Sequence, residues 1–265
     1  MRILFFGTPG FAVPALERLL EGPDTVAGVV SQPDRPSGRG LRTEPTPVAR
    51  RAREAGVPLL QPEKLRAAGT LEELRALRPD LIVTCAFGRI LRPSLLELPV
   101  HGCLNIHASL LPRHRGAAPV VRSILDGDLW SGITIFRLDE GMDTGPMLLQ
   151  RMERILPDDT TGSLTDRLAL LGGTAIREAC DRIREGSATF VPQEEHGATY
   201  APRLRKEEGE LSWSRPADQI ERFLRAMDPW PGCRTRHAGR PLRVAAVEPL
   251  DRIPLEEPPG TILSA

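Results

Sequence analysis

Lysine is almost missing from this chain of 265 residues. Of its 35 basic residues, only Lys64 and Lys206 are lysines, and the other 33 are arginines. Because arginine is so common, a single arginine is weak evidence for a binding site. The formal net charge is zero, so a polyanionic partner would have to be bound by a local cluster of basic side chains.

Cysteine pairs and long apolar runs are missing as well. The four cysteines are widely spaced without a CxxC motif, which is typical of a reduced protein and predicts a cytoplasmic location. No run of about 18 apolar residues occurs, so we expect no transmembrane helix and no membrane partner. The hydrophobic fraction of 40% and the charged fraction of 26% are ordinary for a globular protein.

Short apolar strands alternate with amphipathic helical patterns over most of the chain. This alternation predicts an α/β fold with a doubly wound, Rossmann-like and mostly parallel sheet. In such sheets, ligands bind at the carboxyl ends of the strands. We predict strands at residues 2–6, 26–31, 80–86, 103–107, 132–138 and 147–153, and helices near 11–21, 46–56, 70–78, 117–126 and 163–185.

The pattern changes after residue 186. Residues 187–207 are polar and loop-like, and a helix is predicted near 216–227. The remaining residues form short apolar runs that proline and glycine interrupt, which is typical of short strands. We therefore expect an α/β domain at residues 1–186, a linker at 187–207 and a small β domain at 208–265.

The stretch LNIHASLLPRHRGAAP at residues 104–119 carries polar side chains to the end of a predicted strand. Asn105 and His107 have the same parity along that strand, so both side chains can face one pocket. Taken alone, the pair is explained equally well as a hydrogen-bonded strand end. No nucleophilic serine or cysteine stands out nearby, because Ser109 lacks the G-x-S-x-G motif.

A second polar run, LDEGMDTGPM at residues 138–147, favours a site. It lies between two predicted strands and contains Asp139, Glu140 and Asp143 among residues that allow tight turns. One of these carboxylates could reach the imidazole of His107. That pairing would raise the pKa of the histidine and fix the orientation of its ring.

Two other ligand classes are disfavoured. GTPGFA at residues 7–12 lies where a dinucleotide-binding fingerprint would be, but it has one of the three required glycines, and Asp34 lies in a run typical of a turn. His101, Cys103 and His107 could share one face of a strand, but no fourth ligand has a familiar spacing. We therefore expect neither a nicotinamide cofactor nor a metal.

The run SQPDRPSGRGLRTEP at residues 31–45 predicts a long loop that contains Arg35, Arg39 and Arg42. Arginine makes planar, bidentate contacts to phosphates and to guanine edges, and long loops are often functional. The residues alone leave two explanations open: a nucleic-acid contact, or a solvated loop in an arginine-rich protein.

Several motifs together resemble the folate-dependent formyltransferases. The run N-x-H-x-S-L-L-P-x-x-R-G-x-x-P at 105–119 and the run DEGMDTG at 139–145 are similar to motifs shared across that family. GTPGFA, SQPDRPSGRG, AFGRIL and DPWPG are similar to motifs of the members that act on tRNA. The similarity runs almost from end to end and keeps its order.

The resemblance implies transfer of a formyl group from 10-formyltetrahydrofolate to the α-amine of methionyl-initiator-tRNA. The amine would attack directly and form a tetrahedral intermediate. Asn105, His107 and Asp143 match the family's catalytic residues. Asn105 and a protonated His107 would stabilise the oxyanion, and Asp143 would hold the ring and help to move a proton.

The resemblance also implies where the substrates bind. It places Arg35, Arg39 and Arg42 in a loop that contacts tRNA, and it predicts a cytoplasmic monomer. The C-terminal domain would be a small, OB-like β-barrel that helps to hold tRNA, and we expect it to be incomplete because relatives continue beyond Ala265. The folate site would contain Arg89, Ile90, Leu91, Ser109, Leu110, Leu111, Pro112, Asp139, Glu140 and Gly141.

Three alternatives stay open at this point. A formyltransferase acting on an amino-sugar nucleotide would share the catalytic residues and the folate site. A folate- or RNA-binding protein without turnover would share the binding residues alone. An NAD-dependent oxidoreductase would share only the type of fold.

Overall fold

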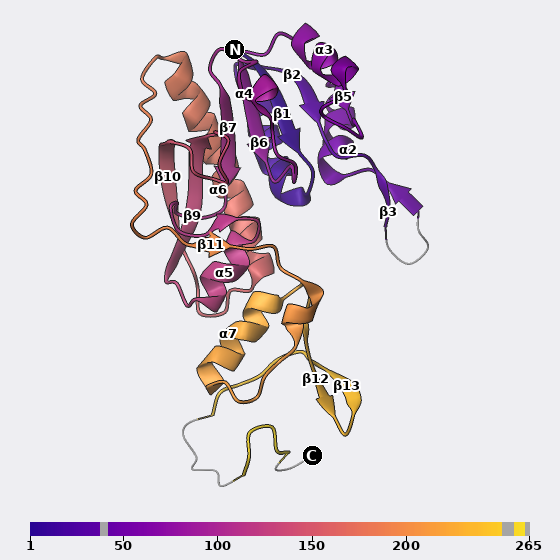
Figure 1. Ribbon diagram of the computed structural model, residues 1–265, viewed down its shortest axis with the longest axis vertical. Coiled ribbons are helices and arrows are strands. Elements are labelled where there is room, and N and C mark those ends of the chain that lie inside the picture. Colours follow the sequence, from indigo (N-terminus) through magenta and orange to yellow (C-terminus); the bar gives the residue numbers. More distant parts are fainter. Residues whose placement is uncertain (38–41, 251–256, 263–265) are drawn as a thin grey trace.

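Most strands of the chain join one large sheet (Figure 1). The computed structural model describes residues 1–37, 42–250 and 257–262. The order of strands in the sheet is β10-β9-β7-β6-β1-β2-β5. Five of them run parallel, and β9 is antiparallel to both of its neighbours, which confirms a mostly parallel α/β sheet. The strands are β1 (Arg2–Gly7), β2 (Thr25–Val30), β5 (Leu59–Leu60), β6 (Leu81–Cys85), β7 (Cys103–His107), β9 (Trp130–Arg137) and β10 (Met147–Arg154).

Helices cover both faces of this sheet. Successive side chains of β1 point to opposite faces, so Ile3 and Phe5 are buried in one apolar cluster and Leu4 and Phe6 in another. Each fully buried Leu or Phe side chain contributes on the order of 2 kcal/mol to folding, so the sheet is a firm platform for the loops at its strand ends. Four helices cover the first face: α1 (Val13–Leu20), α2 (Pro47–Glu54), α5 (Pro119–Leu125) and α6 (Thr161–Arg184). The short 3₁₀ helix η1 (Gly10–Ala12) precedes α1. Two helices cover the second face: α3 (Ala68–Ala76) and α4 (Pro93–Leu96). Among the described helices, none is long and apolar enough to cross a membrane.

The short edge strand β5 is the element of this sheet that the sequence pattern did not indicate. Leu59 and Leu60 pair with Val29 and Val30 of β2. Two residues are too few to show the alternation by which strands are recognised, because that pattern needs about four residues or more.

The segment after β2, expected to be a long loop, contains a β-hairpin. β3 (Arg35–Ser37) pairs antiparallel with β4 (Arg42–Glu44), so that Arg35 lies opposite Glu44. The expectation of an unstructured loop is therefore wrong for these residues, since backbone groups of the two strands pair with each other. Arg39 lies outside the described residues. The hairpin projects from the body of the α/β domain (Figure 1).

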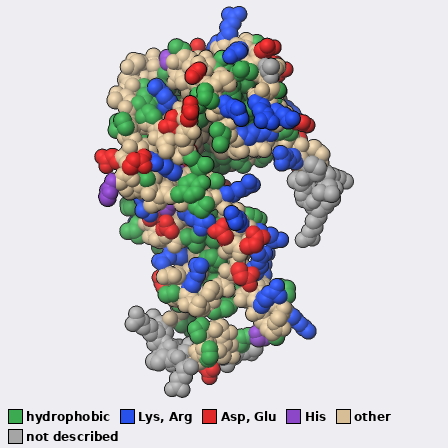
Figure 2. Space-filling view, in the orientation of Figure 1, with side chains coloured by type: hydrophobic (Ala, Val, Ile, Leu, Met, Phe, Trp, Pro, Cys, Tyr) green, Lys and Arg blue, Asp and Glu red, His purple; other side chains and the backbone are tan. Residues whose placement is uncertain are grey.

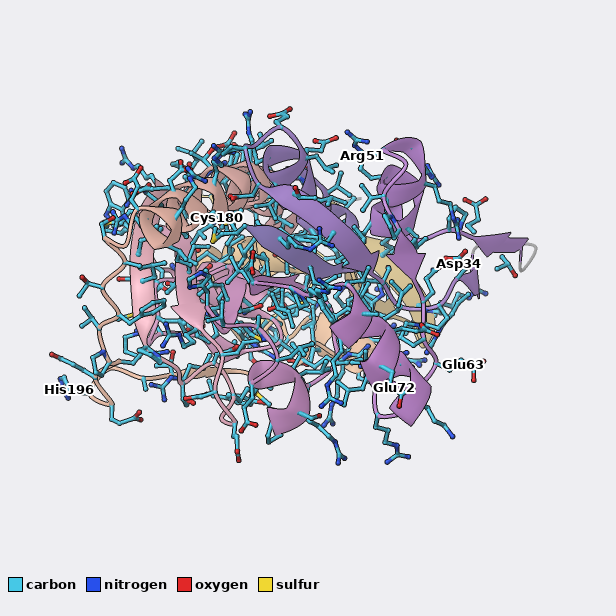
Figure 3. All side chains as sticks on the ribbon, turned by 90° about the horizontal axis from the view of Figure 1, so that it is seen from above. Asp34, Arg51, Glu63, Glu72, Cys180 and His196 are labelled. Atoms are coloured by element: carbon cyan, nitrogen blue, oxygen red, sulfur yellow. The ribbon has the colours of Figure 1, made fainter. Side chains whose placement is uncertain are left out.

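Asp34 holds the base of the β3–β4 hairpin. Its carboxylate accepts hydrogen bonds from Gln61 Nε2 (2.6 Å), Arg53 Nη2 (3.1 Å) and the Thr46 N–H (3.3 Å). Burial opposes ionisation, but these hydrogen bonds outweigh burial and keep the pKa of Asp34 below its usual value. Asp34 thus has a structural role at the turn, near the start of the hairpin in Figure 3.

The segment predicted as a linker is packed on the α/β domain. Val191 and Met147 of β10 exchange two backbone hydrogen bonds of 2.8 Å. Farther along, β11 (Tyr200–Ala201) pairs in parallel with β8 (Arg115–Gly116). We refer to residues 190–201 as the connecting segment; it passes beside β10 and then crosses toward α5 (Figure 1).

The C-terminal residues form a helix and a hairpin. The 3₁₀ helix η2 (Lys206–Gly209) leads to α7 (Ala217–Met227), which packs against α5. β12 (Cys233–His237) and β13 (Arg240–Val244) then pair antiparallel. The predicted small β region with antiparallel strands is present. A closed barrel needs more strands than this one pair, and residues 208–250 and 257–262 contain no other named strand.

All four cysteines are buried and free. Burial raises the pKa of the Cys103 and Cys180 thiols to about 12 and that of Cys233 to about 11. Burial also raises the pKa of Cys85 far above its usual value. The thiols therefore stay protonated and away from solvent.

Candidate active site

Asn105 and His107 lie at the carboxyl end of β7, next to the end of β6. Asn105 is paired in register with Thr84 of β6. Thr84 Oγ1 donates a hydrogen bond of 2.6 Å to Asn105 Oδ1, and Thr84 itself is 3% exposed. This buried contact fixes the side-chain amide, so that its nitrogen is available to donate to a ligand.

The ring of His107 is buried and its orientation is fixed by the backbone of the following loop. His107 Nε2 lies 2.9 Å from the carbonyl oxygen of His114. Since a carbonyl can only accept, Nε2 must carry a proton in this arrangement. Nδ1 is therefore the ring nitrogen that gains and loses a proton, and it is the one that faces Asp143.

Asp143 comes to His107 from the turn between β9 and β10. Its Oδ2 atom lies 3.6 Å from His107 Nδ1 and accepts a hydrogen bond of 2.8 Å from the Gly116 N–H. The backbone of Asp143 is left-handed, with φ of 56°, which aspartate tolerates better than most residues. The 3.6 Å gap is too long for a direct hydrogen bond, so the carboxylate acts on the ring mainly through its charge.

The pKa of His107 lies below its ordinary value. Burial of the ring lowers it and outweighs the charge of Asp143 and the hydrogen bond to His114, both of which raise it. The charge of Asp143 raises this pKa, as the pairing was expected to do, but burial of the residue, which is only 5% exposed, outweighs that effect. The imidazole is neutral at neutral pH, and Nδ1 can accept a proton.

The sequence pattern did not single out His114 as part of this arrangement. Its backbone is left-handed, with φ of 59°, and this conformation aims its carbonyl at His107. Its buried ring lies 2.6 Å from Asp128, measured from Nε2 to Oδ2. Thr84, Gly116 and His114 act on the predicted residues only through contacts across strands and loops, so no sequence spacing could have indicated them.

The Ser109–Pro112 stretch forms a turn that is tied to the neighbouring strands. Ser109 is buried, and its hydroxyl donates to the Arg113 carbonyl at 2.6 Å. Thr134 of β9 donates to the Ser109 carbonyl (2.7 Å) and accepts from the Leu111 N–H (3.1 Å). The Ser109 hydroxyl is thus engaged inside the turn, and Leu111 is buried, while Leu110 and Pro112 are partly exposed.

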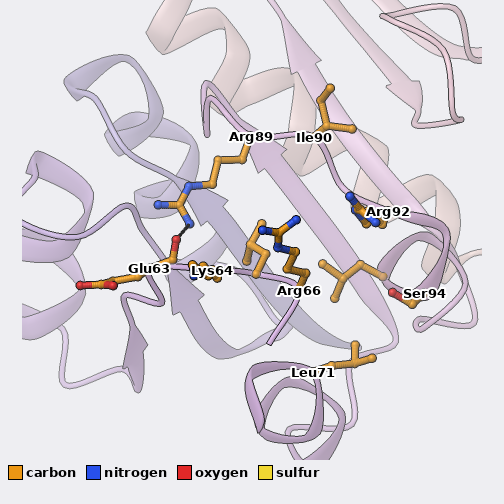
Figure 4. Close-up of a pocket in the computed structure, with 10 residues that line it drawn as sticks. Glu63, Lys64, Arg66, Leu71, Arg89, Ile90, Arg92 and Ser94 are labelled. Carbon is orange, nitrogen blue, oxygen red and sulfur yellow. Dashed lines mark hydrogen bonds between the residues drawn. The ribbon is translucent and has the colours of Figure 1, made fainter. Parts of the chain in front are cut away.

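Arg89, Ile90 and Leu91 follow the end of β6, on the loop next to the one that starts after His107. Leu91 is buried, whereas Ile90 is 81% exposed. Arg89 Nη1 donates to the Pro62 and Glu63 carbonyls at 2.9 and 3.0 Å. These contacts form one wall of a cavity of about 560 Å³, shown in Figure 4. Its lining includes the cationic residues Lys64, Arg66, Arg89 and Arg92 together with apolar Ile90, Leu71 and Leu95.

Asp139, Glu140 and Gly141 belong to the same turn as Asp143. The Asp139 carboxylate accepts hydrogen bonds from the Gly141 N–H (3.0 Å) and the Thr144 hydroxyl (2.8 Å). A Cβ atom at position 141 would collide with Thr144 Oγ1 and would displace the hydroxyl that binds Asp139. Asp139 therefore shapes the turn, and the exposed Glu140 side chain makes no hydrogen bond or ion pair with the described residues.

The structure does not bring the arginines of the β3–β4 hairpin to His107. Arg35 is exposed on β3, and Arg42 begins β4. Figure 2 shows Lys and Arg side chains gathered along the side from which this hairpin projects. The residues around His107 and the basic hairpin are thus separate parts of the molecule. Within the described residues, no group of three or more His, Cys, Asp or Glu could hold a metal ion.

Comparison with known proteins identifies the class to which this fold and site belong. Residues 1–180 match the formyl transferase family, and residues 203–265 match the C-terminal domain of formyl transferases. The chain therefore belongs to the formyl transferase family, which confirms the resemblance seen in its motifs.

Similar proteins with curated names point to one kind of formyl transferase within this family. Methionyl-tRNA formyltransferase from Magnetococcus marinus is 49% identical over 245 residues, which cover 92% of this chain and 78% of the relative. Methionyl-tRNA formyltransferase from Marinobacter nauticus is 48% identical over 264 residues, which cover 100% of this chain and 85% of the relative.

Solved structures share the fold at lower identity. A 4-N formyltransferase from Francisella tularensis superposes with a TM-score of 0.72 at 19% identity, covering 95% of this chain and 99% of that chain. An N-formyltransferase from Helicobacter canadensis, in complex with folinic acid and dTDP-3-aminofucose, gives a TM-score of 0.70 at 19% identity, covering 90% and 85%. At such identity these structures support the fold alone.

Proposed function

We propose that this chain transfers the formyl group of 10-formyltetrahydrofolate to the α-amine of methionyl-initiator-tRNA. The observation that carries this proposal is the meeting of Asn105, His107 and Asp143 at the end of β7. The identity of 48–49% with methionyl-tRNA formyltransferases over at least 92% of the chain also supports it.

Asn105 and His107 provide the groups that direct attack by an amine requires. The folate supplies the formyl carbon as an activated amide. When the amine attacks, the carbonyl oxygen gains negative charge, and the Asn105 amide N–H stabilises that charge. His107 Nδ1 accepts the proton that the amine loses, because Nε2 keeps its own proton on the His114 carbonyl.

Asp143 stabilises the imidazolium that this proton transfer creates. Its carboxylate lies 3.6 Å from Nδ1, close enough for strong attraction in a site with little water. The protonated ring can then donate to the oxyanion or to the leaving nitrogen. No covalent intermediate on the enzyme is needed, since both substrates react with each other directly.

We assign the folate site to the two loops that follow β6 and β7 and to the turn that carries Asp143. The cavity beside Arg89 and Ile90 combines apolar walls with four cationic side chains, and this composition fits a ligand with an aromatic part and carboxylates. The residues assigned are Arg89, Ile90, Leu91, Ser109, Leu110, Leu111, Pro112, Asp139, Glu140 and Gly141.

The tRNA is assigned to the β3–β4 hairpin and the C-terminal region. Because the chain has no net charge, phosphates must be bound by local groups of arginines such as Arg35, Arg39 and Arg42. We keep the division into a catalytic domain at residues 1–186, a linker at 187–207 and a tRNA-binding domain at 208–265. We also propose a cytoplasmic monomer without a metal, and sedimentation of the purified chain would test the monomer.

The test is formylation by the purified chain of initiator tRNA charged with methionine, in the presence of 10-formyltetrahydrofolate. We expect formylmethionine on the tRNA, no transfer to an amino-sugar nucleotide, and no change in NAD(P)H absorbance. Transfer to the sugar nucleotide instead would make the chain a sugar formyltransferase. Substrate binding without any product in a single turnover would make it a binding protein.

A further inference from the structure

The connecting segment touches both loops that define the His107–Asp143 pair. The first loop carries the His114 carbonyl, which holds His107 Nε2. The second loop carries Asp143, whose carboxylate is held by the Gly116 N–H of the first loop. The relative position of the two side chains therefore depends on how these loops are fixed to each other.

Backbone pairing fixes the first loop to the connecting segment. The Arg115 N–H donates to the Thr199 carbonyl, and the Ala117 N–H donates to the Ala201 carbonyl, both at 2.9 Å. The His114 N–H donates to Thr199 Oγ1 at 2.8 Å. These three contacts surround the residue whose carbonyl orients the ring of His107.

The side chain of Gln193 fixes the second loop to the same segment, next to the backbone pairing of Val191 with Met147. Gln193 Nε2 donates to the carbonyl oxygens of Asp143 and Gly145, each at 2.8 Å. Gln193 Oε1 accepts from Arg115 Nε at 3.1 Å. The carboxamide thus joins the Asp143 turn to Arg115, which neighbours both His114 and Gly116.

The two carbonyls held by Gln193 belong to the backbone on which the Asp143 side chain stands. The Asp143 carbonyl belongs to the peptide that follows its left-handed Cα, so rotation of that peptide would move the carboxylate as well. On the other side of the turn, Gly145 is packed so closely on the Arg137 carbonyl that a Cβ atom would not fit. Gln193 holds the turn from the connecting segment.

We propose that Gln193 is a positioning residue for the formyl transfer reaction. It keeps the Asp143 carboxylate beside His107 Nδ1, and it makes the connecting segment between the two domains a working part of the active site. The inference rests on the proposed function, since it assumes the roles given to His107 and Asp143.

Two variants separate the contacts that Gln193 makes. Gln193→Ala removes all of them. Gln193→Glu keeps the size and the oxygen that accepts from Arg115 Nε, but it cannot donate to the Asp143 and Gly145 carbonyls. We expect both to lower kcat by about 10- to 100-fold, because a shift of about 1 Å in a catalytic group costs on that order. The KM values for tRNA and folate should stay within about threefold. If Gln193 served only Arg115, Gln193→Glu would keep wild-type kcat.

The pH profile gives a readout that a structural role would not change. The charged or titratable groups that act on the His107 ring are Asp143 and His114. In Gln193→Ala, which adds no charge, the Asp143 carboxylate can move away and then raises the pKa of His107 less, so the acid limb of kcat/KM should shift to lower pH. Simple loss of folded protein would lower kcat at every pH without moving that limb.

A double-mutant cycle completes the test. In an Asp143→Ala background, Gln193→Ala should cause no further loss of kcat, because it acts through Asp143. Glu194→Ala, an exposed neighbour on the same segment, is the matched control and should leave kcat unchanged. An additive loss in the cycle, or a kcat within about twofold of wild type for Gln193→Glu, overturns the inference. Failure of the wild-type chain to formylate tRNA would instead overturn the proposed function.

Discussion

The motifs indicated two functional regions, the surroundings of His107 and the β3–β4 hairpin. These two regions differ in burial and in how their side chains are held. His107 is 5% exposed, and each of its ring nitrogens faces an acceptor whose own position is fixed. Arg35 is exposed, and its hairpin is held by backbone pairing of two three-residue strands.

This difference follows from the different functions proposed for the two regions, which are catalysis and tRNA binding. Chemistry on a carbonyl needs donors whose orientation is fixed before the substrate arrives, and burial strengthens their electrostatic effect. Recognition of phosphates needs cations that reach into solvent and release bound counterions. Substitutions near His107 should therefore change kcat, while substitutions in the hairpin should change KM for tRNA and its dependence on salt.

The largest effect is expected from His107→Ala or Asp143→Ala. Removing the proton acceptor, or the charge that stabilises it, should lower kcat by about 10³-fold. Formylation of charged initiator tRNA under saturating conditions measures this effect, with thermal unfolding as the control for folding. Activity within a few-fold of wild type would mean that the buried centre is not the site of chemistry.

An intermediate effect is expected from Thr84→Val, which touches neither substrate. Valine has nearly the shape of threonine but cannot donate to Asn105 Oδ1, so the amide is free to turn. Loss of such a hydrogen bond is worth about 1.4 kcal/mol, or about tenfold in kcat. The double variant Thr84→Val/Asn105→Ala should then have nearly the same kcat as Asn105→Ala alone. A kcat equal to that of wild type would show that Asn105 needs no orientation by β6.

The smallest effect is expected from Arg35→Ala in the hairpin. Loss of one exposed phosphate contact should raise KM for tRNA by a few-fold at low salt, and the salt dependence should become shallower by about one ion. KM for folate and kcat should not change. Arg18→Ala serves as the control, because Arg18 is an exposed arginine of α1 that pairs with Glu21. Equal effects of both variants would remove the distinction between the two regions.

The sequence predicted the fold well because its elements are long and strongly patterned. Strands β1, β6 and β7 are runs of buried residues, and α6 spans Thr161–Arg184 with a regular apolar face. The antiparallel placement of β9 and the two-residue strand β5 depend on pairing with distant residues, which no local pattern encodes.

Asn105 and His107 were found from the sequence because strand parity puts both on one face. Asp143 was one of three candidate acids, and the resemblance to a family selected it. The contacts from Thr84, His114 and Gln193 were not foreseen, since each joins a side chain to an atom many residues away. Gln193, in particular, lies in a stretch whose polar composition predicted only a linker.

The four buried cysteines allow the folded state of this protein to be measured by chemical labelling. With thiol pKa values of about 11 to 12 for Cys103, Cys180 and Cys233, the intact chain should resist alkylation at neutral pH, and only opened molecules should be labelled. Mass spectrometry after brief treatment with iodoacetamide would then measure the fraction of opened molecules in the same sample that is assayed. This measurement distinguishes a variant that has lost catalytic activity from one that has lost its fold.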